Sequence, residues 1–97
     1  MYLLEVLSGP LDGKTWTFER EITIGRDEAL ASACISLDRY VSRRHAKLRA
    51  APEHLYLTDL ESRNGTKLDD KPVSGEMALD VGAPFVVGRT VLRVTRV

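Results

Sequence analysis

The sequence has little of several features that define large classes of protein. Its single cysteine, Cys34, excludes an internal disulfide and falls short of the ligand sets of zinc sites, so we expect a reducing, cytoplasmic setting. No apolar stretch is long enough to cross a bilayer, and no basic segment precedes the apolar residues that follow Met1. We therefore expect neither membrane insertion nor export.

The sequence also has no excess of charge of either sign. Fourteen Lys and Arg residues balance 14 Asp and Glu residues, so no global field would draw the chain to nucleic acid or to an anionic membrane. Any site for an anion must be local. The 97 residues fit one domain with its own core. We expect residues 1–97 to form a single domain that needs no cofactor and no metal.

Short runs rich in Val, Ile, Leu, Thr and aromatic residues alternate with clusters of Gly, Pro, Asp and Asn, which is typical of a sandwich or barrel. Helix is nearly absent, because the one candidate, 27–31, is too short to be stable and is predicted as a loop. The predicted strands are 2–7, 15–18, 21–24, 34–37, 46–49, 55–58, 66–68, 84–87 and 89–97. This spacing predicts an all-β sandwich of two packed, mainly antiparallel sheets, with binding loops at one end.

Three loop segments carry the residues of chemical interest, and each lies at the end of a predicted strand: 25–26, 42–45 and 62–66. Arg26 has a planar fork of donors that matches phosphate oxygens, Ser42 offers a hydroxyl, and Arg43 is a second cation. If they converge, they could hold a dianion through charge-assisted hydrogen bonds. Asn64 has both a donor and an acceptor and could orient the main chain of an extended peptide, while Gly65 permits a tight turn.

These segments resemble the motifs of the forkhead-associated (FHA) domain, a phosphothreonine-binding β-sandwich. The matching text is ITIGR at 22–26, VSRRHA at 41–46 and DLESRNGT at 59–66, with further family positions at 7–10, 13–14 and 81–82. One such fragment would be a weak signal. Three in the right order, inside a strand-rich chain of one-domain length, form a strong one.

The resemblance implies an FHA/SMAD-like sandwich and a role for each matching residue. Phosphate binding falls to Arg26, Ser42 and Arg43. Peptide binding falls to Asn64 and Arg63. Gly25, His45 and Gly65 shape and brace the loops, and no residue is catalytic. The implied partner is a phosphothreonine-containing protein, the substrate of a Ser/Thr kinase, with threonine preferred over serine because its methyl group fills a small apolar pocket.

Two positions depart from the family pattern without removing a phosphate contact. Cys34 stands where an acidic residue is common, although the residue itself fits a small buried strand position. Arg63 stands where smaller polar residues are common, beside Asn64. The basic residues of these loops lead to the hypothesis that an acidic residue follows the phosphothreonine; they are Arg39, Arg44, Arg63 and Lys67.

Two other functions remain open from the residues alone. An enzyme could use Ser42, His45 and Asp59, but triads are set by geometry, and the chain has no Gly-x-Ser-x-Gly elbow and no P-loop. A sandwich of the same fold could also be a phosphate-independent scaffold or assembly domain, because fold does not fix function. The presence of Arg26 and Asn64 argues against the scaffold, although each could alone be a surface or turn residue.

Overall fold

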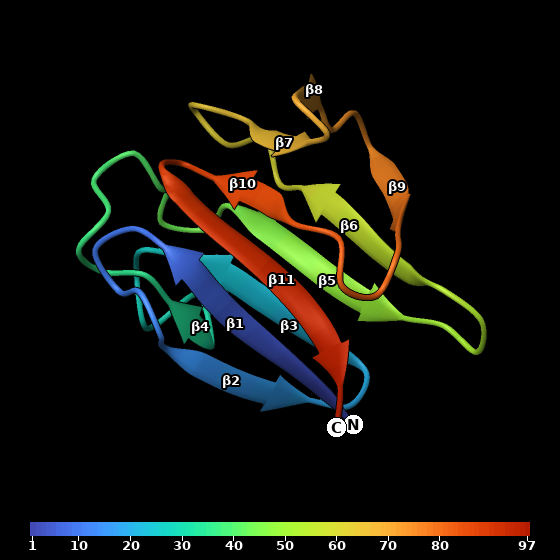
Figure 1. The fold of residues 1–97 in the computed structure, drawn as a ribbon. Helices are drawn as coiled ribbons and strands as arrows, with labels where there is room; N and C mark the ends of the chain where they lie inside the picture. The colour runs from blue at the N-terminus through green and yellow to red at the C-terminus, as the bar shows by residue number, and fades with distance from the viewer.

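The computed structural model describes residues 1–97 and consists of eleven strands joined by turns and loops, with no helix. The strands are β1 (Tyr2–Ser8), β2 (Thr15–Phe18), β3 (Glu21–Gly25), β4 (Ala33–Cys34), β5 (Ala46–Ala50), β6 (Leu55–Asp59), β7 (Thr66–Leu68), β8 (Lys71–Pro72), β9 (Glu76–Leu79), β10 (Phe85–Val87) and β11 (Thr90–Arg96). Figure 1 shows two layers of strands, with the two termini side by side at one end. With no helix, the chain has none that could span a membrane.

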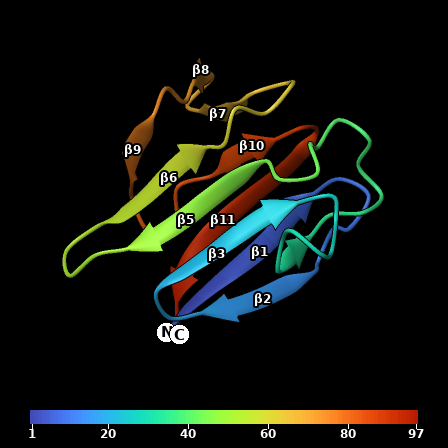
Figure 2. The ribbon, with the colours of Figure 1, turned by 180° about the vertical axis from the view of Figure 1, so that it is seen from behind.

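The two layers are separate, mainly antiparallel sheets, which confirms the predicted sandwich. One sheet has the order β2-β1-β11-β10-β7-β8 and the other has the order β4-β3-β5-β6-β9. Only the short pairing of β4 with β3 is parallel. Viewed from behind, β3, β5 and β6 lie in front of β1 and β11 (Figure 2).

The core lies between the sheets and follows from the alternation of apolar and polar residues along each strand. In β11, Leu92 and Val94 are buried, while Arg93 and Thr95 on the other face are partly exposed. Strand β1 repeats the pattern, and its Leu4 is paired with Val94. Eighteen buried apolar residues form one cluster, most of them on strands. Because the core is close-packed, the loops extend from a rigid base.

The edge strands differ most from the sequence-based expectation. The strand predicted for 34–37 is wrong in its bounds, because β4 covers only Ala33–Cys34 and the chain then turns. Cys34 is also not buried as predicted. Ala33 and Ile35 are fully buried on the core side, so Cys34 faces outward and is partly exposed. Strands β8 and β9 were not predicted, because they are short and carry charged residues or proline.

A buried carboxylate, Asp38, ties two loops together at the end of the sandwich remote from the termini. Its side chain accepts hydrogen bonds from Tyr40 N at 2.9 Å, from Arg89 N at 2.9 Å and from the Thr90 hydroxyl at 2.7 Å. Gly88 completes the junction, because a Cβ there would lie 2.9 Å from the carbonyl carbon of Tyr40. The β4–β5 loop is thereby fixed to the β10–β11 turn.

We predict that Asp38→Ala lowers the free energy of unfolding by about 3 kcal/mol, because it leaves the buried Thr90 hydroxyl and the main-chain N–H of Arg89 without their acceptor. Urea unfolding followed by Trp16 fluorescence would measure the change. The matched control is Asp80→Ala, since Asp80 is exposed and its carboxylate accepts no hydrogen bond. A loss of less than about 0.5 kcal/mol in Asp38→Ala would mean that the junction does not depend on this carboxylate.

Candidate functional site

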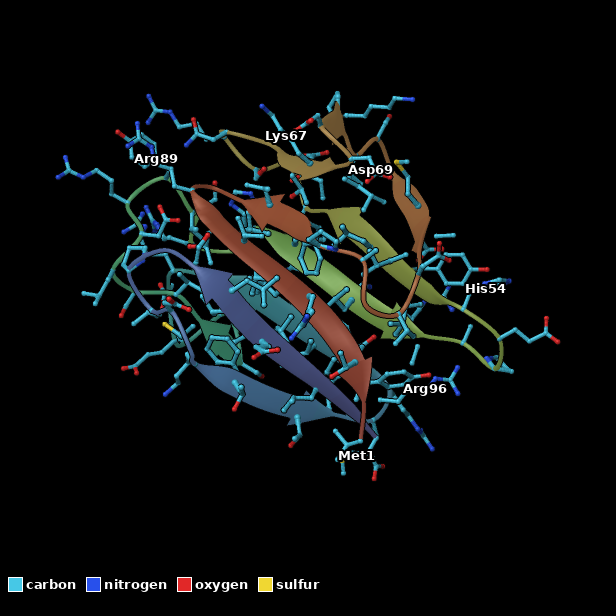
Figure 3. All side chains as sticks on the ribbon, in the orientation of Figure 1. Met1, His54, Lys67, Asp69, Arg89 and Arg96 are labelled. Carbon is cyan, nitrogen blue, oxygen red and sulfur yellow. The ribbon has the colours of Figure 1, made fainter.

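Three loops that are distant in sequence meet at the end of the sandwich remote from the termini (Figures 1 and 2). They are the β3–β4 loop (26–32), the β4–β5 loop (35–45) and the β6–β7 loop (60–65). Arg89, in the β10–β11 turn, lies at the same end, whereas Met1 and Arg96 lie at the other end (Figure 3). The structure therefore brings together the three segments that the sequence singled out.

Arg26 is held by the backbone of the neighbouring loop. Its Nε donates to the carbonyl of Val41 at 3.0 Å, and its main-chain N donates to the carbonyl of Ser42 at 3.0 Å. The side chain is exposed and forms no ion pair, so both terminal Nη groups are available. A guanidinium fixed through Nε presents its remaining donors in a defined direction.

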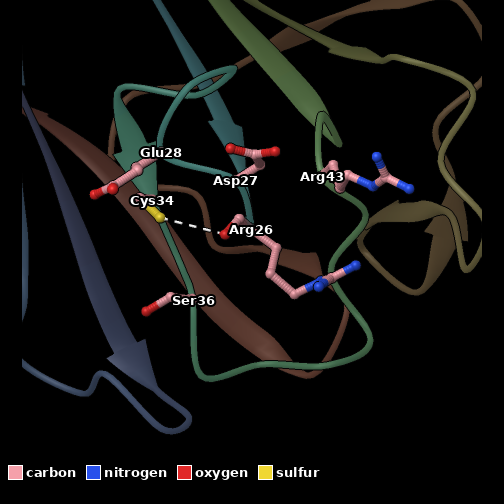
Figure 4. A pocket seen from close by; sticks show the side chains of 6 residues that line it. All are labelled: Arg26, Asp27, Glu28, Cys34, Ser36 and Arg43. Carbon is pink, nitrogen blue, oxygen red and sulfur yellow. Dashed lines mark hydrogen bonds between the residues drawn. The ribbon is translucent and has the colours of Figure 1, made fainter.

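Arg26 and Arg43 line one open hollow, with their guanidinium groups extending to the same side of it (Figure 4). We call it the Arg26 hollow; its lining residues are Arg26, Asp27, Glu28, Cys34, Ser36 and Arg43. Arg43 is exposed and forms no ion pair. The two carboxylates of the hollow, Asp27 and Glu28, were not among the predicted site residues. Glu28 lies across from the arginines (Figure 4). Like-charge repulsion confines an anion to the arginine side.

Ser42 and Asn64 each use one polar group to hold the loops and keep another available. The Ser42 hydroxyl oxygen accepts from Arg63 N at 3.0 Å, which leaves its proton to donate. Asn64 Nδ2 donates to the carbonyl of Tyr40 at 2.9 Å, which leaves Oδ1 to accept and a second N–H to donate. These bonds join the β4–β5 and β6–β7 loops directly.

His45 joins the same two loops from beneath, and its side chain is fully buried. Its Nδ1 accepts from Ser42 N at 2.9 Å, and its Nε2 donates to the carbonyl of Gly65 at 2.9 Å. This pair of contacts needs the neutral ring with its proton on Nε2. Burial lowers the pKa of His45, and the hydrogen bond to Gly65 and the charges of Asp59 and Asp38 oppose that shift.

Two glycines allow the backbone of the site to adopt its shape, one through a close approach and the other through a left-handed turn. A Cβ at Gly25 would lie 2.1 Å from the carbonyl oxygen of Arg43, so only glycine lets β3 pass against the backbone of Arg43. Gly65 has a φ of 80°, in the left-handed region that favours glycine. Both therefore occupy positions that shape the loops.

Asp59 organises the β6–β7 loop and was not among the predicted site residues. Its carboxylate accepts from Ser62 N at 3.2 Å, from the Ser62 hydroxyl, and from the Thr66 hydroxyl at 2.8 Å. The Ser62 hydroxyl accepts in turn from Gly65 N at 2.9 Å. An aspartate at a strand end with serine three residues later is a local signal for such a turn.

The arrangement of Ser42, His45 and Asp59 is not that of a catalytic triad. His45 Nδ1 is bonded to the main-chain N–H of Ser42 and not to its hydroxyl, and Nε2 is bonded to a carbonyl. No proton path therefore runs from the hydroxyl to the imidazole. The structure also has no group of three or more His, Cys, Asp or Glu side chains placed to hold a metal ion.

Family and sequence comparisons agree with this geometry. A family model described as the cytoplasmic domain of an inner membrane component of T3SS matches residues 5–97. The chain is 37% identical over 90 residues to the FHA domain-containing protein FhaB of Mycolicibacterium smegmatis and 36% identical to FhaB of Mycobacterium tuberculosis. Each match covers 92% of this chain and 57% of the relative, so the chain spans little more than half the length of these proteins.

Solved structures extend the comparison. An FHA domain from a structural and functional analysis of phosphothreonine-dependent FHA domain interactions is 31% identical, with a TM-score of 0.83 and coverage of 99% of this chain and 96% of the other. The FhaA FHA domain complexed with the intracellular domain of Rv3910 is 30% identical, with a TM-score of 0.81 and coverage of 97% and 99%. The FHA domain of CT664 from Chlamydia trachomatis, at 23% identity and a TM-score of 0.90, shares the fold. Together these matches establish that the chain belongs to the forkhead-associated domain family.

Proposed function

We propose that residues 1–97 form one FHA domain that docks a phosphothreonine-containing segment of a partner protein and catalyses no reaction. The observation that carries this proposal is that Arg26 and Arg43 line one hollow and that Arg26 N is bonded to the Ser42 carbonyl, while all three side chains keep donors that no protein group uses. Donors of this kind bind a dianionic phosphate through charge-assisted hydrogen bonds.

The contacts within the loops prepare the site before the ligand arrives. Because Arg26 is already held by the Val41 carbonyl and Ser42 by Arg63 N, little side-chain freedom would be lost on binding. Asn64 keeps an amide oxygen and an N–H with which to fix the main chain of the peptide. Phosphorylation then acts as the switch for docking, since an unmodified threonine brings no negative charge to the arginines.

The relatives support this class of partner. One similar domain is described through phosphothreonine-dependent interactions, and another forms a complex with the intracellular domain of a second protein. For this chain, the proposed partner is a protein phosphorylated on threonine by a Ser/Thr kinase. The proposed setting is the cytoplasm, which agrees with the free thiol of Cys34 and with the cytoplasmic family model.

A phosphate-independent scaffold of the same fold is the alternative. The family model for a secretion-system component favours it, because an assembly role can rest on a sheet face. The loop end favours phosphate binding, because a scaffold has no need for the unpaired Arg26 and Arg43 beside the fixed hydroxyl of Ser42. Binding that persists without phosphate would select the scaffold.

We predict that Arg26→Ala weakens binding to phosphothreonine peptides by about 3 kcal/mol, because one partner of a charged hydrogen-bonded pair is lost. Titration calorimetry with a pool of phosphothreonine peptides with randomised flanks would measure this, against the same pool with phosphoserine or unmodified threonine.

The control is Arg44→Ala, since Arg44 is exposed in the neighbouring β4–β5 loop and lines no hollow with Arg26. We expect Arg44→Ala to bind within about twofold of the parent domain, in line with a solvent-exposed charge. A loss below about 0.5 kcal/mol in Arg26→Ala, or equal binding of the unmodified pool, would refute the assignment.

We predict that the free domain loses stability as the pH falls from about 7.5 to about 5.5. The pKa of His45 lies below its ordinary value of 6.5 because of burial, so the unfolded chain takes up a proton in this range before the folded protein does. Urea unfolding at several pH values would show the trend. Glu76 does not affect stability in this range, because its pKa is lowered from 4.5 by its hydrogen bond with Arg49.

The second histidine of the chain provides the control for this effect. His54 is exposed at the tip of the β5–β6 loop, so His54→Ala should keep the whole pH dependence. A stability that stays constant down to about pH 5.5, or a dependence that disappears in His54→Ala, would contradict the role of His45. Peptide affinity should fall over the same range, because the phosphate, with a pKa of about 6, also gains a proton.

A further inference from the structure

The loop end of the domain carries more positive charge than one phosphothreonine requires. Six of the ten arginines of the chain lie there: Arg26, Arg39, Arg43, Arg44, Arg63 and Arg89. None of them forms an ion pair, and the only two ion pairs of the structure join side chains on the sheets, Arg49 with Glu76 and Arg93 with Glu5. A single phosphate brings about two negative charges. The surplus therefore calls for a second anion.

Part of this surplus forms a second hollow that shares no residue with the Arg26 hollow. We call it the Arg39 hollow, and its lining residues are Arg39, Tyr40, Arg63 and Asn64. Both of its arginines are exposed, and no acidic residue lines it. In this respect it is more strictly cationic than the Arg26 hollow, which contains two carboxylates.

The walls of the Arg39 hollow are fixed to one another and to the rest of the site. Asn64 Nδ2 is bonded to the Tyr40 carbonyl, and Arg63 N is bonded to the Ser42 hydroxyl. The guanidinium of Arg89 lies 4.1 Å from the centre of the Tyr40 ring, which holds that ring and adds a cation behind it. Asp38, the acidic residue adjacent to Arg39, is buried with both oxygens engaged.

Four basic residues led to the hypothesis that an acidic residue follows the phosphothreonine, and the structure places them at different sites. It brings Arg39 and Arg63 together in one hollow. Arg44 lines no hollow, and Lys67 lies in a different one beside Asp69 and Asp70. Only two of the four can act on the same group of a ligand.

The spacing of the two hollows fits one short peptide. Arg39 and Arg43 are four residues apart, so their backbones are separated by at most about 14 Å. An extended peptide covers that distance in about four residues. Asn64 lines the Arg39 hollow and is also the proposed guide of the peptide main chain. A peptide of about four extended residues that Asn64 orients is therefore long enough to reach both hollows.

We propose that the Arg39 hollow binds a second phosphoryl group, so that the domain selects a segment phosphorylated twice, at residues two to four positions apart. The inference rests on the proposed function of the Arg26 hollow. The two guanidinium charges of Arg39 and Arg63 match the charge of a phosphate better than that of a carboxylate, and a phosphate has more oxygens for their donors and for the Tyr40 hydroxyl.

The test compares peptides that differ only in the second group. The tightest singly phosphorylated peptide from the randomised pool is first remade with alanine two, three and four residues away on either side, so that no acidic residue reaches the Arg39 hollow. A second phosphothreonine then replaces each of these alanines in turn. A parallel set carries glutamate at those positions. We expect at least one doubly phosphorylated peptide to bind about tenfold more tightly than the single one, and the matching glutamate peptide to gain less than about threefold.

The variant that isolates the second hollow is Arg39→Ala. It should remove the tenfold gain and leave the affinity for the singly phosphorylated peptide within about twofold, whereas Arg44→Ala should keep the gain. A gain that survives Arg39→Ala, an absence of gain at every spacing, or an equal gain from glutamate would overturn this inference alone. Failure of the singly phosphorylated peptide to bind would overturn the proposed function and this inference with it.

Discussion

The geometry of the loop end depends on the buried imidazole of His45. Its two ring nitrogens bond the main chain of Ser42 on one side and of Gly65 on the other, and in a fully buried position the loss of either partner leaves a polar group unsatisfied. The ring must be neutral to accept one hydrogen bond and donate the other, and burial also favours the neutral form. Two loops that are 20 residues apart in sequence thereby hold a single relative position.

The polar groups at this end have divided tasks. Arg26, Ser42 and Asn64 each give one group to the protein and leave another free, so the same side chain builds the site and faces the solvent. Two carboxylates complete the framework: the buried Asp38 holds the β4–β5 loop, and the partly buried Asp59 holds the β6–β7 loop. Preorganisation of this kind reduces the entropy that binding must overcome.

Charge is distributed so that a neutral protein has a cationic end. The formal net charge is zero, yet six unpaired arginines gather on the loops, while Arg49 and Arg93 are paired with glutamates on the sheets. An exposed ion pair adds little stability, so the two pairs on the sheets contribute little to the fold. The loop arginines, which have no carboxylate partner, remain available for binding. A local excess of positive charge can attract an anionic ligand, while the zero net charge gives no general attraction to nucleic acid or membranes.

The sequence by itself determined the all-β class, most strands and the two arginines of the Arg26 hollow, Arg26 and Arg43, because alternation, turn residues and short motifs are local signals. It misplaced β4, missed β8 and β9, and gave Cys34 a buried position, because short edge strands depend on pairing more than on composition. Only the tertiary structure decided that Arg39 joins Arg63 and that Arg44 and Lys67 stand apart. Such contacts are set by how the sheets pack and by the hydrogen bonds of Asp38, Asp59 and His45, and no local pattern encodes the distance between two loops.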